Sequence, residues 1–147
     1  MSDFSLTKRR IEETTDNKVR VDISKYREMK DSASVNDLIE NTELSSGSCN
    51  RFLIRFKSAE TDELYAKCEY LLFHTEDVAL IEWTEVVESI TGNGIGRVLR
   101  KEAIEQMGDR TIYTNIINSN LITVAIDQGF KQIQDGPLKG WFVLEPE

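Results

Sequence analysis

The sequence predicts an α/β fold, of the α+β kind, with a mixed, mostly antiparallel central sheet flanked by helices. Residues 51–87 are rich in aromatic and β-branched residues in segments separated by short turns, which is typical of an antiparallel meander. A glycine-rich loop at residues 91–96 precedes a stretch with helical periodicity. The chain then ends in a strand–helix–strand pattern, so we expect the sheet to be mixed.

The length of 147 residues fits one domain, which we assign to residues 18–147. Residues 1–17 have few apolar residues and mix charges, so they are expected to form a flexible or loosely packed N-terminal tail or a short surface helix. Polar and apolar residues alternate over 18–24, the pattern of a half-buried strand. Apolar residues then recur at rough helical spacing over 26–43, which fits one broken helix or two short ones.

The remaining elements follow from apolar runs bounded by turn residues. Behind the glycine loop, apolar residues recur at helical spacing until Gly108, which is expected to end that helix, and Gly129 is expected to end the next one. The elements expected in this part are a loop at 44–50, strands at 51–57, 64–73 and 78–87, a helix at 95–107, a strand at 111–117, a helix at 119–128, and short strands at 130–133 and 141–144.

Charge and cysteine content exclude several classes of protein. The chain has 18 lysines and arginines against 26 aspartates and glutamates, a net charge of −8, which argues against broad nucleic-acid binding because phosphate contacts need clustered basic residues. Cys49, expected to be exposed in a polar loop, and Cys68, expected to be buried in a strand, form no paired-cysteine zinc site, and we expect no metal. No apolar run approaches the ~18 residues of a membrane span. We therefore expect a cytoplasmic protein with no membrane partner.

The loop Gly92-Asn-Gly-Ile-Gly96 has the composition of an anion site. Glycine lets the backbone approach a ligand closely, and the first turn of the following helix carries free N–H groups that suit phosphate. Arg97 and Val98 follow the last glycine, so the loop is not a P-loop, which needs Gly-Lys-Ser/Thr there. It also lacks the third glycine of a dinucleotide-binding loop, and antiparallel-looking strands precede it.

The loop resembles the pyrophosphate-binding motif of the GNAT acyltransferase superfamily, written (Gln/Arg)-x-x-Gly-x-(Gly/Ala). Laid on this chain, the motif covers residues 91–96. Gly94 and Gly96 match its two glycines, and the following Arg-Val-Leu looks like the start of the family's helix. Thr91 departs from the motif, because it stands where the family has a long polar side chain.

A second segment strengthens the resemblance, which covers roughly residues 50–145. Asn118 is followed eleven and twelve positions later by Gly129-Phe130, a spacing that the family shows. Ala125 departs, because it occupies the position of a tyrosine that often protonates the departing thiolate of coenzyme A. Alanine cannot donate a proton, so water or a hydroxyl such as that of Thr123 would have to take this role.

The resemblance implies acetyl-CoA as co-substrate, with its pantetheine arm in a gap beside the strand that precedes the loop. Arg97 and Arg100 would add positive charge near the phosphates, although Arg100 also fits a solvated helix face. The residues that the resemblance implies in cofactor binding are Val86, Thr91, Asn93, Gly94, Ile95, Gly96, Arg97 and Asn118.

Amine acetylation needs a base that takes a proton from an ammonium group before the amine attacks the thioester. The candidates are Glu82, Glu85 and Glu88, and strict alternation would put Glu82 and Glu88 on one face of the strand and Glu85 on the other. We favour Glu85, which lies beside the expected pantetheine strand, with Glu82 as the second candidate. The alternative is that all three are ordinary surface or salt-bridged carboxylates. Trp83 is expected in the core or the wall of the cleft.

The function implied is N-acetyltransfer from acetyl-CoA to a primary amine of a small molecule or a protein, and the acid excess favours a cationic acceptor. One alternative is a catalytically weak or inactive module that binds coenzyme A or a protein. The other is an acidic inhibitor of a basic partner, in which the glycine loop would be only a structural turn. The resemblance also implies that two copies can pair as a homodimer.

Overall fold

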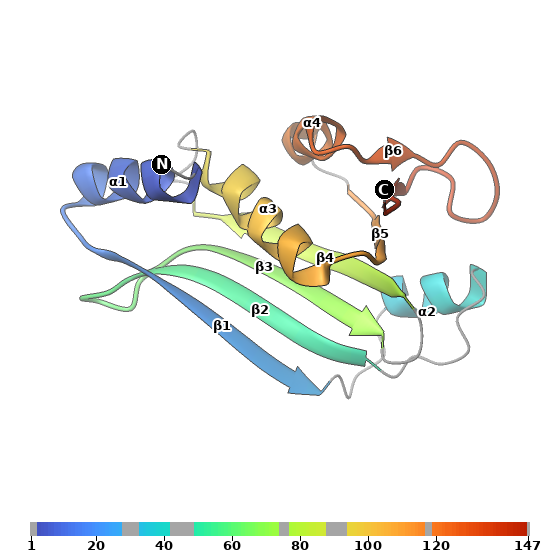
Figure 1. Cartoon of the computed structure of the whole chain (residues 1–147), viewed down its shortest axis with the longest axis horizontal. Coiled ribbons are helices and arrows are strands. Elements are labelled where there is room, and N and C mark those ends of the chain that lie inside the picture. Colours follow the sequence, from blue (N-terminus) through green and yellow to red (C-terminus); the bar gives the residue numbers. More distant parts are fainter. Residues whose placement is uncertain are drawn as a thin grey trace.

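The computed structural model describes residues 3–27, 33–41, 49–73, 77–87, 94–116 and 119–146. Within this part of the chain, one sheet runs in the strand order β1-β2-β3-β4-β5-β7-β6, with helices on both faces (Figure 1). The strands are β1 Val19–Arg27, β2 Cys49–Ser58, β3 Leu64–Phe73, β4 Val78–Val86, β5 Thr111–Thr114, β6 Lys131–Gln132 and β7 Phe142–Leu144, and the helices are α1 Asp3–Thr15, α2 Ala33–Asn41, α3 Ile95–Met107 and α4 Ser119–Asp127.

The topology confirms the predicted fold class. Strands β1 to β4 form the antiparallel meander, and β7 pairs antiparallel with both β5 and β6. Among the described strands, the one parallel pair is β4 with β5, and α3 makes the crossover between them, as a parallel connection requires. The expected helix at residues 95–107 is observed with those same bounds.

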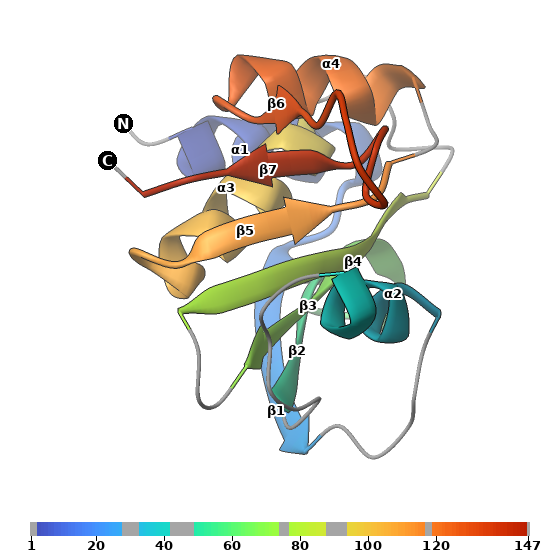
Figure 2. The same ribbon diagram turned by 90° about the vertical axis from the view of Figure 1, so that its right-hand side faces the viewer.

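Two apolar clusters hold the helices on opposite faces of the sheet (Figure 2). The main core joins one face of β2, β3 and β4 to α1, α3 and α4, through side chains such as Ile54, Ile81 and Leu99. The second core lies under α2, where Leu38 packs with Leu71 and Leu80. The face of the sheet that packs against α1, α3 and α4 is therefore covered by more helices than the face under α2.

The N-terminal residues form helix α1, which is packed against the domain and is not a loose tail. Ile11 has no exposed surface and belongs to the main core, and Thr7, one turn earlier, is also buried. The carboxylate of Glu12 accepts a hydrogen bond of 3.0 Å from the backbone N–H of Val19, which fixes the entry into β1. A helix can be anchored by a narrow stripe of buried side chains at positions i and i+4. The low apolar content of residues 1–17 therefore did not reveal that α1 packs against the domain.

Three further differences lie at element boundaries. Cys49 begins β2 and is buried, so the prediction that it is exposed in a loop was wrong. Residues 26 and 27 extend β1 by pairing with β2, where the sequence suggested helix, and α2 begins only at Ala33. The expected strand at 111–117 ends earlier, at Thr114, and residue 117 lies outside the described residues. Residues 44–48 of the expected loop lie outside the described residues.

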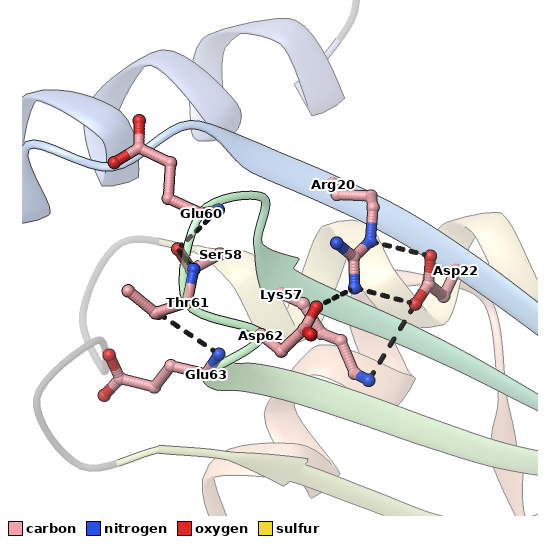
Figure 3. A network of polar contacts seen from close by, with 8 residues as sticks. All are labelled: Arg20, Asp22, Lys57, Ser58, Glu60, Thr61, Asp62 and Glu63. Carbon is pink, nitrogen blue, oxygen red and sulfur yellow. Dashed lines mark hydrogen bonds and ion pairs between the residues drawn. The ribbon is translucent and has the colours of Figure 1, made fainter.

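An ion-pair network ties edge strand β1 to the turn after β2 (Figure 3). The guanidinium of Arg20 contacts the carboxylates of Asp22 and Asp62, and Lys57 lies 3.8 Å from Asp22. The Arg20 hydrogen bond lowers the pKa of the Asp62 carboxyl below its ordinary value. These groups are solvent-accessible, so the network fixes geometry and adds little stability. In the described part of the chain, no helix combines the length and apolar character that a membrane crossing needs.

Candidate functional site

The two parallel strands at the centre of the sheet separate and leave a cleft between them. β4 and β5 pair from Val78 with Thr111 as far as Ile81 with Thr114, and the described residues pair no further. The buried hydroxyl of Thr114 donates a hydrogen bond of 3.0 Å to the carbonyl of Ile81 at this last pair. A cavity of about 610 Å³ opens beyond it, lined by residues 81–86 of β4, by Arg100, by residues 114–116 and by Leu121. Its volume is in the range of small-molecule and cofactor sites.

A β-bulge in β4 sets which side chains face each side of this cleft. Tyr70 of β3 pairs with Ile81, but its neighbour Glu69 pairs with Trp83, which leaves Glu82 as an extra residue. The bulge shifts the alternation by one position. Side chains that would have pointed toward α3 now point to the opposite face, and the reverse also holds.

The bulge overturns the expected separation of the two candidate bases. A carboxylate oxygen of Glu82 lies 3.2 Å from the guanidinium of Arg51, and a carboxylate oxygen of Glu85 lies 3.8 Å from the ammonium of Lys67. Both cations also contact Glu69, at 3.0 and 3.6 Å. Glu82 and Glu85 therefore belong to one charge network on one side of β4, and the prediction that they lie on opposite faces was wrong. Glu88 is outside the described residues.

This side of the cleft, which we call the acid wall, consists of Glu82, Trp83 and Glu85. The Trp83 side chain is 56% exposed, so Trp83 stands in the cleft wall, one of its two expected locations, and not in the core. Glu85 is about half exposed, whereas Glu82 is mostly covered. The wall thus offers carboxylates beside an accessible aromatic face, a combination that suits a cation.

Helix α3 begins beside the far end of the same cleft. Gly94 is its N-cap with φ +77°, a left-handed conformation that glycine adopts without strain, and no side chain caps the helix there. A Cβ on Gly96 would lie 3.4 Å from the Val86 side chain, so this glycine lets α3 pack closely against the end of β4. The first-turn N–H groups of residues 95–97 have no acceptor inside the helix. The Ile95 side chain itself is buried in the core.

Of the remaining candidate residues, Arg97 is described and three are not. The Arg97 guanidinium forms an ion pair of 2.9 Å with Asp127, so it is engaged with α4. Thr91, Asn93 and Asn118 lie outside the described residues.

Arg100 does not lie on a solvated helix face. It is 1% exposed and lines the cleft from the α3 side, on the helix stripe that also contains Ala103 and Met107. Its Nη1 lies 3.5 Å from the Thr84 hydroxyl and its Nε 3.4 Å from the side-chain oxygen of Gln128. Burial lowers the pKa of the Arg100 guanidinium below its ordinary value.

Sequence reasoning missed three polar residues of this site. Thr84 faces α3 only because of the bulge, which the residue pattern does not announce. Thr114 ends β5 and looks like an ordinary strand threonine. Gln128 follows α4, and its amide nitrogen donates to the carbonyl of Arg97 at 3.1 Å while its oxygen faces Arg100, a link between helices that no sequence spacing encodes.

Cys68 lies behind Thr84 and is fully buried, as expected for a cysteine in a strand. Burial raises the pKa of its thiol to about 11, although a contact of 3.7 Å with the Thr84 hydroxyl acts in the opposite direction. The thiol is therefore protonated at neutral pH and is not a nucleophile of the cleft.

Comparison with solved structures finds the same architecture. A putative GNAT-family acetyltransferase from Desulfovibrio desulfuricans matches 84% of this chain and 99% of its own, with a TM-score of 0.53 and 14% identity. PaiA N-acetyltransferase from Thermoplasma acidophilum, in complex with coenzyme A, matches 65% of this chain and 60% of its own, with a TM-score of 0.51 and 17% identity. A mutant AtaT toxin bound to the C-terminus of the antitoxin AtaR and to acetyl-CoA matches 84% of this chain and 92% of its own, with a TM-score of 0.51 and 11% identity.

No protein-family model matches the sequence, and no curated protein matches it. At these identities the structural matches establish the fold. The chain has the fold of the GNAT acetyltransferases, a mostly antiparallel mixed sheet with helices on both faces.

Proposed function

We propose that this protein transfers an acetyl group from acetyl-CoA to a primary amine. The observation that carries the proposal is the combination of the β4–β5 cleft with the glycine-led N-terminus of α3 beside its outer end. A helix N-terminus binds phosphate, and an unpaired strand edge binds the amide groups of an extended ligand arm. Two proteins of the same fold carry coenzyme A or acetyl-CoA, which supports the same ligand class here.

The cleft and the N-terminus of α3 would fix the orientation of the bound coenzyme A thioester. The pyrophosphate would bind the backbone amides of Gly94, Ile95, Gly96 and Arg97, with Thr91, Asn93 and Asn118 as further candidates. The pantetheine arm would follow β4 inward from Val86, because residues 82–86 have no partner strand on the β5 side among the described residues. The thioester would then lie near the inner half of the cleft, between Thr84 and the last β4–β5 pair.

The direction of the ligand changes our preference between the two candidate bases. Glu85 lies one residue from Val86, at the outer end of the cleft, whereas Glu82 follows directly after the last pair at Ile81. Glu82 is therefore nearer to the reacting carbon, and it would take the proton of the ammonium directly or through one water. Ala125 is fully buried in the core, so the proton for the departing thiolate would come from water.

The acceptor would enter from the acid wall. Its ammonium group would bind the carboxylate of Glu85 and the face of Trp83, a pair of contacts that selects a cation over a neutral alcohol. This supports a cationic amine, such as a polyamine or a lysine side chain, as the acceptor class.

Calorimetric titration of acetyl-CoA tests the binding half of the proposal, and Gly94→Leu with Gly108→Leu forms a matched pair. Both glycines flank α3 with positive φ, and at neither would a Cβ meet another atom within 4 Å. Both variants thus carry backbone strain, but only Gly94 lies at the proposed phosphate site. Gly94→Leu is expected to weaken binding at least about tenfold and Gly108→Leu less than about threefold. Equal affinities in the two folded variants would refute the phosphate site.

Release of free coenzyme A thiol with a panel of amines tests the chemistry. Glu82→Gln is expected to lower kcat by about 100-fold or more with KM for acetyl-CoA unchanged, and Glu85→Gln is expected to raise KM for the amine. Binding of acetyl-CoA without thiol release for any amine would identify the chain as a module that binds the coenzyme without catalysis. An absence of binding would favour the acidic inhibitor instead.

A further inference from the structure

The side chain of Arg100 is a buried cation whose donors are largely unused. A guanidinium has five N–H donors in a fixed planar arrangement. Nε and Nη1 make long contacts of 3.4 and 3.5 Å with Gln128 and Thr84, and Nη2 has no hydrogen-bond partner among the described residues. The ring of Phe130 lies 5.6 Å from the guanidinium carbon and covers one face. Buried donors are normally satisfied, so an unpaired Nη2 on a residue that lines the cleft indicates a missing partner.

The missing partner is an anion, and the described part of the chain does not provide it. No carboxylate of the described residues forms an ion pair with Arg100, because Glu82 and Glu85 are engaged with Arg51 and Lys67. The nearby Cys68 thiol is protonated, since burial raises its pKa to about 11. A buried charge that lacks its counter-ion costs several kcal/mol. A guanidinium kept in a cleft at that cost is suited to an anionic group that arrives with the ligand.

The position of Arg100 along the cleft decides which part of the ligand this is. Arg100 meets β4 at Thr84, two residues inward from Val86, where α3 begins. It also lies on the α3 side, whereas the acid wall faces the opposite side. The phosphates would bind at the outer end and the amine at the acid wall, so the group that reaches Arg100 is the tail of the acyl chain.

We propose that the preferred donor of this protein is a carboxyacyl-CoA, the coenzyme A thioester of a short dicarboxylic acid such as malonate or succinate, with its distal carboxylate bound by Arg100. This inference rests on the proposed function and narrows its donor class. A carboxylate accepts two parallel N–H bonds from a guanidinium, and it would occupy the unused Nη2 together with Nη1 or Nε. Thr84 would add a hydroxyl donor to the same carboxylate.

The transfer step is balanced without a further reactant. The amine lone pair forms a C–N bond to the thioester carbon, the C–S bond breaks, and its electron pair leaves on sulfur. The ammonium gives one proton to the Glu82 carboxylate, which passes it to water. After the C–N bond forms, the nitrogen gives its second proton to water and the departing thiolate takes one proton from water, so one proton is released overall. The distal carboxylate remains ionised throughout. The charge of the acceptor therefore falls by two, because one ammonium is lost and one carboxylate is gained. This weakens its attraction to the acid wall and favours product release.

Calorimetry on the unaltered protein provides the first test. Malonyl-CoA and succinyl-CoA are compared with butyryl-CoA, whose acyl chain is of similar length but uncharged, and with acetyl-CoA. A charge-assisted pair in a buried site is expected to make at least one carboxyacyl-CoA bind about tenfold tighter than butyryl-CoA. Equal or weaker binding of both carboxyacyl thioesters would overturn this inference and leave the proposed function intact. Failure of every thioester to bind would refute the proposed function itself.

Variants of Arg100 provide the second test. Arg100→Met is expected to abolish the preference for the carboxyacyl thioester. Arg100→Lys keeps the positive charge but not the planar pair of donors, so it is expected to keep part of the preference. Lys101→Met removes an exposed cation at the adjacent position and is expected to keep the full preference. Circular dichroism of each variant confirms that it is folded. A preference that survives in Arg100→Met would assign the carboxylate to another residue.

Discussion

Removal of the Arg100 charge is expected to stabilise the ligand-free protein. Most truncations of a buried side chain destabilise a fold, because they leave a cavity. Arg100→Met instead replaces a buried cation by an unbranched apolar side chain of similar length, which fits the same space between Thr84 and Phe130. The expected sign is therefore opposite to that of an ordinary core substitution.

The magnitude follows from the balance between the favourable interactions of the guanidinium and its burial cost. The substitution removes two weak hydrogen bonds of 3.4 and 3.5 Å, which are longer than the normal range, and a cation–π interaction with Phe130. Together these contribute about 1–2 kcal/mol. The substitution also removes two unfavourable contributions, the desolvation of a buried charge and the unsatisfied Nη2. Together they cost about 3 kcal/mol or more. The net stabilisation expected is about 1–2 kcal/mol, within the range known for replaced buried charges.

Urea denaturation at pH 7, with the midpoint and slope fitted for each protein, measures this difference. Lys101→Met serves as the control and is expected to change stability by less than about 0.5 kcal/mol, because its side chain is exposed. A saturating carboxyacyl-CoA at 100 times its Kd would add about 2.7 kcal/mol to the wild type, which would remove the advantage of the variant. Destabilisation of Arg100→Met by about 1 kcal/mol or more would show that Arg100 is a structural residue and refute the reasoning.

Three further predictions concern the surroundings of the cleft. Thr114→Val removes the buried hydroxyl that donates to the Ile81 carbonyl, so it is expected to lower the free energy of unfolding in urea by about 1–2 kcal/mol. Thr111→Val on the same strand is the control and should lower it by less than about 0.5 kcal/mol. Equal losses in the two variants would contradict the role of this hydrogen bond. Because burial raises the pKa of Cys68 to about 11 from 9.0, the folded thiol keeps its proton where the unfolded one loses it. The free energy of unfolding should therefore fall by up to about 1.4 kcal/mol per pH unit between pH 9 and 11, and it should fall less steeply in Cys68→Ala. Parallel pH profiles of the two proteins would refute this contribution of Cys68. Arg51→Met leaves two mostly covered carboxylates without this cation, so a loss of about 2 kcal/mol in urea unfolding at pH 7 is expected. A loss of less than about 0.5 kcal/mol would contradict the role of these ion pairs.

Much of the fold could be predicted because its signals are local. Alternation marked the strands of the meander, and apolar spacing between two glycines marked α3 with its observed bounds. The packing of α1 could not be predicted in the same way. It depends mainly on Ile11, and one side chain in a polar helix gives no periodic signal.

The candidate site was predictable where it depends on the backbone and unpredictable where it depends on register. Gly94 and Gly96 indicated a helix N-terminus beside a strand end, because Gly94 has a left-handed conformation that glycine adopts without strain and Gly96 leaves room for the Val86 side chain. The faces of Glu85 and Thr84 were not predictable, since the bulge that exchanges them arises from pairing with β3, far away in sequence. Arg100 was placed correctly on α3 but not in the cleft, because a charged residue on a helix normally faces water.

The extra residue in β4 has a consequence for how this chain can vary over evolution. A substitution at Glu82 changes one side chain, but a deletion there would restore plain alternation and exchange the two sides of the strand end at once. Glu85 would turn under α3 into the core, and Thr84 would turn away from Arg100. Point substitutions can therefore change the side chains on the two sides of β4 independently, whereas a change in strand length alters both sides together.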